Sequence, residues 1–126
     1  MKRTPVIAAK APAAIGPYSQ GISSGEMLFV SGQIPAGADG AIVAGGVAEQ
    51  SEQCLKNIME ILLGGGLTMN DVVKTTVFMT DLGQFAAMNE VYARHFRAPF
   101  PARATVQVSA LPKGASVEIE AVAVRP

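Results

Sequence analysis

Hydrophobic residues recur along the chain with two different periods, and each period predicts a different kind of element. Between residues 47 and 63 the apolar residues lie three or four positions apart, which predicts an amphipathic helix. Glycines 64–66 should end this helix, because glycine tolerates the left-handed conformation of a C-cap. A second helix is predicted from Asp81, an N-cap that forms a capping box with Gln84, to about Arg97. Its predicted apolar face holds Phe85, Met88, Tyr92 and Phe96.

Short runs rich in β-branched or alternating apolar residues predict the strands. Residues 1–25 predict short strands separated by turns, and residues 35–46 predict a glycine-rich loop that turns at Asp39-Gly40. The longer strands are predicted over residues 26–31, a buried strand ended by Gly32, and over residues 72–79, 103–108 and 116–124.

The order of these elements predicts an α/β (α+β) chain with one domain, residues 1–126. Two helices would cover one face of a single mixed sheet. Alternation places side chains of residues 103, 105 and 107 on one face of their strand, and those of residues 118, 120, 122 and 124 on one face of theirs. The uncovered sheet face would be part apolar and part charged, so we expect it to pack against other copies of the chain.

The composition of the chain argues against several classes of partner and cofactor. Lys+Arg and Asp+Glu are both 10, so the formal net charge is +0, which disfavours nucleic acid or a membrane surface as a partner. One Cys and one His exclude a Cys/His zinc site within the chain, and no cofactor-binding motif occurs, so we expect neither a metal nor a cofactor. The lone Cys54 and the lack of a signal peptide favour the cytoplasm.

Several segments, spread over nearly the whole chain, resemble one family. They are residues 11–21 (APAAIGPYSQG), 31–35 (SGQIP), 73–78 (VKTTVF) with Asp81-Leu82, 100–108 (FPARATVQV), 111–113 (LPK) and 117–120 (VEIE). The chain is thereby identified as similar to the RidA (YjgF) family of reactive-intermediate deaminases. The resemblance implies a chorismate-mutase-like fold and a homotrimer, whose central barrel is built from the subunits' sheets and whose pockets lie between subunits.

The resemblance also implies an activity. Family members hydrolyse 2-aminoacrylate-type enamines and imines, such as 2-iminobutanoate and 2-iminopropanoate, which PLP-dependent dehydratases produce, to 2-oxo acids and ammonia. Arg103 matches the arginine that binds the substrate carboxylate, and Glu118 matches the acid that we expect to position water. A nearby Arg103 would keep Glu118 ionised. Thr105 stands where many members carry Cys and where a backbone carbonyl serves the water. Further substrate-binding positions are Tyr18, Ser31, Gly32 and Asn89.

Other interpretations of the same residues stay open. Arg103 and Glu118 could be ordinary strand charges, and an arginine-lined pocket could belong to a non-catalytic module that binds small carboxylates such as 2-oxo acids. RNA-directed and chaperone roles have also been attached to the family, although the neutral charge argues against ribonuclease chemistry. We expect Cys54 to be a buried, inert thiol and His95 to be a surface helix residue.

Overall fold

The structure is a computed structural model, of which residues 2–126 are described. One mixed sheet has the strand order β1-β2-β3-β6-β4-β5, and every neighbouring pair is antiparallel except β4 and β5, which are parallel. The strands are β1 (Arg3–Val6), β2 (Gly21–Ser24), β3 (Met27–Gln33), β4 (Val72–Met79), β5 (Ala102–Gln107) and β6 (Val117–Val124). The helices are α1 (Val47–Gly64) and α2 (Phe85–His95), with short 3-10 turns η1 (Met69–Asp71), η2 (Leu82–Gln84) and η3 (Pro112–Gly114).

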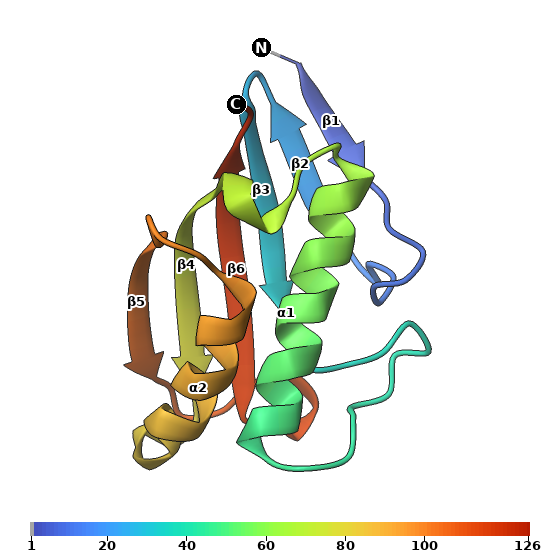
Figure 1. Ribbon diagram of the computed structural model, residues 1–126. Helices are drawn as coiled ribbons and strands as arrows, with labels where there is room; N and C mark the ends of the chain where they lie inside the picture. Colours follow the sequence, from blue (N-terminus) through green and yellow to red (C-terminus); the bar gives the residue numbers. More distant parts are fainter. Residues whose placement is uncertain (1) are drawn as a thin grey trace.

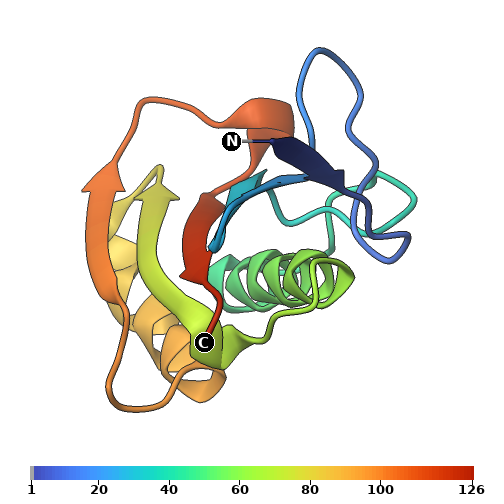
Figure 2. The ribbon, with the colours of Figure 1, turned by 90° about the horizontal axis from the view of Figure 1, so that it is seen from above.

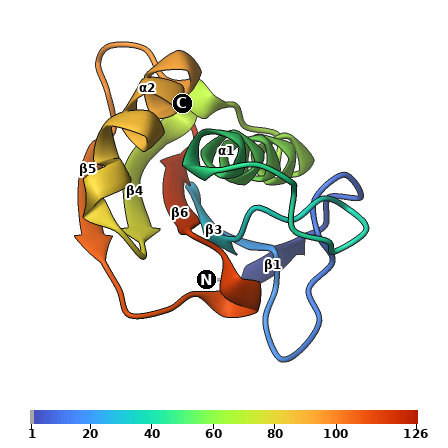
Figure 3. The same cartoon turned by 90° about the horizontal axis from the view of Figure 1, so that it is seen from below.

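Both helices lie side by side on one face of the sheet, as predicted (Figures 1 and 2). No helix or strand of residues 2–126 covers the opposite face, as the view from below also shows (Figure 3). The predicted class, a single mixed sheet with two helices on one face, is therefore confirmed. Neither helix of the described chain is long and apolar enough to cross a membrane.

Helix α1 confirms its predicted periodicity. Its inward-facing side chains are fully buried: Cys54, Leu55, Ile58, Ile61 and Leu62. The glycines end it as expected, with Gly65 as the C-cap and Gly66 in the left-handed region at φ +78°. The backbone N–H of Leu67 then donates to the carbonyl of Leu62, which closes the last turn.

Helix α2 is shorter than predicted at both ends. Asp81 caps the 3-10 turn η2 and not α2, because its Oδ1 accepts the Gly83 N–H two residues on, at 2.8 Å. Gln84 therefore forms no capping box with it, and α2 begins at Phe85. The helix ends at His95, since Phe96 has an extended backbone and the prolines that follow cannot continue a helix. On the predicted apolar face Met88, Tyr92 and Phe96 are buried, whereas Phe85 is 37% exposed.

Strand β3 departs from its prediction in two ways. It does not end at Gly32 but continues to Gln33, with a shift in its pairing to β6 between Val30 and Gln33. A glycine at such an irregularity allows the strand to bend without ending. The strand is also only half buried: Leu28 and Val30 face the helices, while Met27 and Phe29 on the other face are exposed, because that face is uncovered.

The two faces of the sheet differ sharply in burial. On β6, Val117, Ile119, Ala121 and Ala123 are buried under the helices, while the alternate residues 118, 120, 122 and 124 point the other way. We call this other side the open face. It also exposes large apolar side chains, including Phe29 at 43% and Val106 at 40%. The predicted uncovered face, part apolar and part charged, is therefore present.

Candidate active site

Arg103 lies on edge strand β5, on the helix-covered face of the sheet. Its Nη1 donates to Oδ1 of Asn89 at 2.8 Å. Its Cζ lies 4.6 Å from the ring centroid of Tyr92 and 5.5 Å from that of Phe85. Among residues 2–126 no carboxylate is within 4.0 Å of this guanidinium. The arginine is thus held by neutral groups, and its remaining N–H donors can serve an anion that is not part of this chain.

Helix α2 supplies the groups around this arginine. Phe85, Asn89 and Tyr92 are four and three residues apart, so they project from one side of the helix. We expected Asn89 to contact substrate or water, but in this structure its Oδ1 contacts Arg103 and orients it. Phe85 and Tyr92 were assigned from the sequence only to the apolar core, although their spacing to Asn89 was the available sign of a shared site.

Thr105 lies on the same side of β5 as Arg103, as the alternation predicts. It pairs with Val77 of β4, a residue buried under the helices. On the same strand, Oε1 of Gln107 accepts the backbone N–H of Leu82 at 2.9 Å and so ties the turn before α2 to β5. Within residues 2–126, strand β5 is an edge strand that pairs with β4 alone, so the backbone groups on its outer edge have no strand partner there.

Glu118 lies on the open face of β6, half-buried, next to Gly32 of β3. A Cβ atom placed on Gly32 would be 3.0 Å from Cδ and 3.1 Å from Oε1 of Glu118. Partial burial raises the pKa of the Glu118 carboxyl above its ordinary value, and repulsion from Glu120 on the same strand face raises it further. The glycine therefore gives the carboxylate room, and the environment makes it a better proton acceptor.

Within one chain, Arg103 and Glu118 lie on opposite faces of the sheet. Arg103 pairs with Thr75 of β4, which in turn pairs with Ala121 of β6, and both of these partners are buried under the helices. Glu118 pairs instead with Phe78, on the open face. Within a single chain Arg103 is therefore not a neighbour of Glu118, whose pKa is raised there. The expectation that Arg103 keeps Glu118 ionised stays a prediction for a site shared between copies.

The candidate site residues thus fall into two groups, which we call half-sites. The arginine half-site comprises Phe85, Asn89, Tyr92, Arg103 and Thr105. The glutamate half-site comprises Tyr18, Ser31, Gly32 and Glu118.

Tyr18 and Ser31 belong to the glutamate half-site in different ways. Tyr18 is 54% exposed and, with Gly32 and Lys113, borders a hollow of about 340 Å³. The hydroxyl of Ser31 donates to the carbonyl of Ser19, and the Ser31 N–H donates to the carbonyl of Gln20. Ser31, predicted as a substrate contact, therefore ties the segment that carries Tyr18 to β3.

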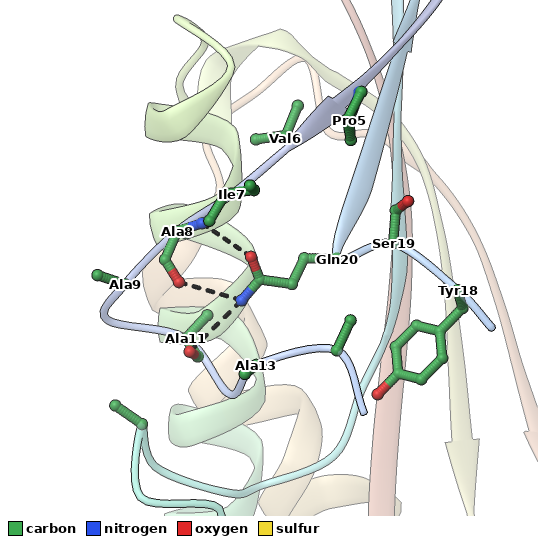
Figure 4. Close-up of a pocket in the computed structure, with 12 residues that line it drawn as sticks. Pro5, Val6, Ile7, Ala8, Ala9, Ala11, Ala13, Tyr18, Ser19 and Gln20 are labelled. Atoms are coloured by element: carbon green, nitrogen blue, oxygen red, sulfur yellow. Dashed lines mark hydrogen bonds between the residues drawn. The ribbon is translucent and has the colours of Figure 1, made fainter. Parts of the chain in front are cut away.

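Gln20 anchors the same segment, a role that is not predicted from the sequence. Its buried side chain accepts the Ala8 N–H at 2.8 Å and donates to the carbonyls of Ala8 at 3.0 Å and Pro12 at 2.8 Å. Figure 4 shows this amide reaching across to Ala8 and Ala11, with Tyr18 on the other side of a hollow of about 400 Å³. The only sign in the sequence was its place two residues after Tyr18 in a matching segment.

Cys54 and His95 take no part in either half-site. Cys54 is fully buried, and burial raises the pKa of its thiol, so the predicted inert thiol is confirmed. His95 is not simply a surface residue. Its Nε2 lies 2.9 Å from Oε1 of Glu52, and this contact joins α2 to α1.

Replacing Gly32 by alanine should impair the site without unfolding the chain. The added methyl group would displace the Glu118 carboxylate, which it approaches to 3.0 Å, while the backbone at Gly32 lies outside the left-handed region. We expect activity to fall about tenfold, because a displacement of 1 Å at a reacting group can lower the rate by that factor or more. Thermal stability should change little. Gly46→Ala is the control, because its Cβ would approach nothing closer than 3.9 Å. Equal activities of the two variants would contradict the assigned contact.

Comparison with known proteins shows which family the chain belongs to. The family described as endoribonuclease L-PSP matches residues 8–125, nearly the whole chain. The chain belongs to this family, the RidA (YjgF) family. This RidA-family chain is 49% identical over 124 residues to the human protein named 2-iminobutanoate/2-iminopropanoate deaminase, covering 98% of this chain and 90% of the human one.

Solved structures agree in fold with this RidA-family chain. A structure of RidA from Psychrobacter sp. PAMC 21119 superposes with a TM-score of 0.92 at 43% identity, covering 96% of this chain and 98% of that one. A structure of TdcF from Escherichia coli with bound serine gives a TM-score of 0.92 at 45% identity, covering 98% and 99%. The family resemblance predicted from the sequence is confirmed.

Proposed function

We propose that this chain hydrolyses 2-iminobutanoate, 2-iminopropanoate and related imines, formed from 2-aminoacrylate-type enamines, to 2-oxo acids and ammonia. The observation that carries the proposal is Arg103, a guanidinium held by Asn89 at 2.8 Å and lacking a carboxylate partner in its own described chain. A planar guanidinium binds a carboxylate through two parallel N–H donors, which fixes the substrate's orientation. A human relative at 49% identity bears the name of this activity.

The reaction needs a base next to the bound imine, and Glu118 supplies it. As the oxygen of water forms a bond to the imine carbon, Glu118 accepts a proton from that water. The electrons of the imine double bond move to the nitrogen, which takes this proton from Glu118, and a carbinolamine forms. Glu118 then transfers the proton of the carbinolamine hydroxyl to the nitrogen. As the carbon–oxygen double bond forms, the carbon–nitrogen bond breaks, and a 2-oxo acid and ammonia remain. The raised pKa of Glu118 suits this role, because a general base works best when its pKa lies near the working pH.

The complete site takes its two charged groups from two copies. Because Arg103 and Glu118 lie on opposite faces of one sheet, the arginine half-site of one copy must meet the glutamate half-site of the next. A cyclic homotrimer that buries the open faces would repeat this contact at every interface, since a head-to-tail contact closes into a ring. The exposed apolar residues of the open face, such as Phe29 and Val106, support its burial.

Thr105 completes the proposed site through its backbone. It lies two residues after Arg103 on the same side of β5, and a carbonyl at this edge strand can accept a hydrogen bond from the attacking water. No thiol is needed for this step, so a threonine serves as well as a cysteine. Tyr18 and the backbone at Gly32 would form the opposite wall, from the neighbouring copy.

The test couples a purified PLP-dependent serine or threonine dehydratase, which generates these imines, to the purified protein. We expect the release of 2-oxo acid and ammonia to be faster than in buffer alone, by a factor that increases with protein concentration. The wild-type protein is first shown to be folded and trimeric. If folded, trimeric protein leaves the buffer rate unchanged, the proposed activity is wrong.

A module that binds small carboxylates without turnover is the second candidate. The arginine half-site alone, with neutral neighbours around Arg103, is sufficient to bind a 2-oxo acid. A receptor of this kind has no use for a second carboxylate such as Glu118 beside its anion, because like charges repel. Calorimetry that shows 2-oxobutanoate binding to a wild-type protein without hydrolytic activity would favour the module.

A further inference from the structure

Tyr92 contacts Arg103 from a direction different from that of Asn89. The Cζ of Arg103 lies over the Tyr92 ring, 4.6 Å from its centroid, whereas Asn89 accepts a hydrogen bond from Nη1. The hydrogen bond restrains one edge of the guanidinium, and the ring restrains its face through a cation–π contact. Together they leave the other edge of the guanidinium free to meet a carboxylate.

Tyr92 is itself fixed in place. Its hydroxyl lies 2.7 Å from Oγ1 of Thr75, and the two residues are 5% and 0% exposed. Thr75 is the residue of β4 that pairs with Arg103 of β5. The ring of Phe96 packs against Tyr92 with a centroid distance of 4.6 Å. Thr75 therefore pairs with Arg103 across the strands and contacts the Tyr92 hydroxyl, while the Tyr92 ring lies under Arg103. Each of these three residues thus contacts the other two.

Burial also keeps Tyr92 neutral. Loss of solvent raises the pKa of its phenol above the ordinary value, more than the contacts with Thr75 and Arg103 lower it. Among the charged side chains of the described residues, Arg103 is the one found over this ring. The ring therefore supplies Arg103 with an uncharged surface and does not neutralise the positive charge that a substrate carboxylate needs.

We propose that Tyr92, held by Thr75, is a positioning residue that sets the plane of the Arg103 guanidinium for the substrate carboxylate. This inference rests on the proposed function, in which Arg103 binds that carboxylate. An arginine side chain has several rotatable bonds, and ordering them only when substrate arrives would weaken binding. Tyr92 orders them beforehand, so its removal affects carboxylate affinity before it affects the hydrolytic step.

The chain offers a matched control for this proposal. Phe96 is buried in the same aromatic pair, 6% exposed, but the cation–π contacts of Arg103 among residues 2–126 are with Tyr92 and Phe85 and not with Phe96. Tyr92→Leu and Phe96→Leu both remove a buried ring and should lower the melting temperature to a similar extent. Only Tyr92→Leu removes the surface under the guanidinium. Tyr92→Phe keeps this surface and removes the hydroxyl alone.

The experiment measures the Kd of 2-oxobutanoate by calorimetry and the kcat and KM of imine hydrolysis. For Tyr92→Leu we expect Kd and KM to rise about tenfold while kcat changes less than about threefold, because a desolvated cation–π contact is lost. Phe96→Leu should stay within about twofold of wild type in Kd, and Tyr92→Phe, which keeps the ring but loses its contact with Thr75, should lie between Phe96→Leu and Tyr92→Leu. A wild-type Kd for Tyr92→Leu, or an equal rise for Phe96→Leu, overturns the inference. An inactive wild type overturns the proposed function instead, and the binding comparison still decides the role of Tyr92.

A second measurement is made on the wild-type protein, and a variant serves only to assign the signal. Protons held over an aromatic ring resonate upfield, so the side-chain N–H signals of Arg103 should be shifted away from those of Arg94, whose side chain is 62% exposed. Loss of one signal in Arg103→Lys identifies it. If the Arg103 signals coincide with those of exposed arginines, the guanidinium is not held over Tyr92 and the inference fails.

Discussion

Replacing Arg103 by alanine is expected to lower kcat/KM for imine hydrolysis by about a hundredfold, since two charge-assisted hydrogen bonds to the carboxylate are lost. The substitution removes both the donors for the substrate and the group that Asn89 orients. Arg103→Lys should recover only part of the loss, because an ammonium ion cannot present two parallel donors or stack on Tyr92 in the same way.

The measurement is the dehydratase-coupled assay, with folding checked by circular dichroism. Arg94→Ala is the matched control, because it also removes one positive charge near α2 but from a side chain that is 62% exposed and paired with Glu90. We expect the control to keep wild-type kcat/KM. Comparable losses in the two variants would show that net charge, and not the placement of Arg103, matters.

Replacing Glu118 by glutamine should have its main effect on kcat. General-base assistance is typically worth about 100- to 10,000-fold, and glutamine cannot accept the proton from water. We expect KM to change little, because Arg103 still binds the carboxylate. Glu120→Gln is the matched control: it lies two residues away on the same face of β6 and is exposed. A Glu118→Gln variant with wild-type kcat would contradict the assigned role.

The pH dependence of the reaction should follow the pKa of the Glu118 carboxyl. The base acts when ionised, so activity falls as the pH drops through its pKa. Burial and Glu120 raise that pKa above its ordinary value within one copy, and the Arg103 guanidinium of the next copy opposes this shift in the complete site. Glu120→Gln removes the repulsion and should move the midpoint of the acid limb to lower pH. The rate in buffer is subtracted at each pH, because free imines also hydrolyse in water.

Local periodicity predicted the elements but not all of their ends. The apolar spacing of α1 holds over 18 residues, which made its position clear in the sequence. Gly32 was assigned as a strand end, since a glycine usually weakens a strand. In the structure it lies within β3, where a side chain would collide with Glu118 of a strand distant in sequence. A contact of this kind cannot be read from neighbouring residues.

The arrangement of the candidate site likewise could be predicted only in part from neighbouring residues in the sequence. The alternation of side chains correctly predicted which residues of the same strand share a face with Arg103 and with Glu118. It could not show that these are opposite faces of the sheet, because that relation depends on how β4 pairs with both β5 and β6. Likewise, the helical period predicted that Tyr92 is buried, but the cation over its ring comes from a separate strand.

The most direct test of a site shared between two copies is to mix two inactive variants. Arg103→Ala and Glu118→Gln proteins are dissociated in denaturant, combined in equal amounts and allowed to reassemble. If each site takes Arg103 from one copy and Glu118 from the next, roughly a quarter of all sites in the randomly reassembled cyclic trimers regain both groups. We therefore predict that about a quarter of wild-type activity returns, while neither variant reassembled alone recovers any. Mixed trimers that stay inactive would contradict a site shared between copies.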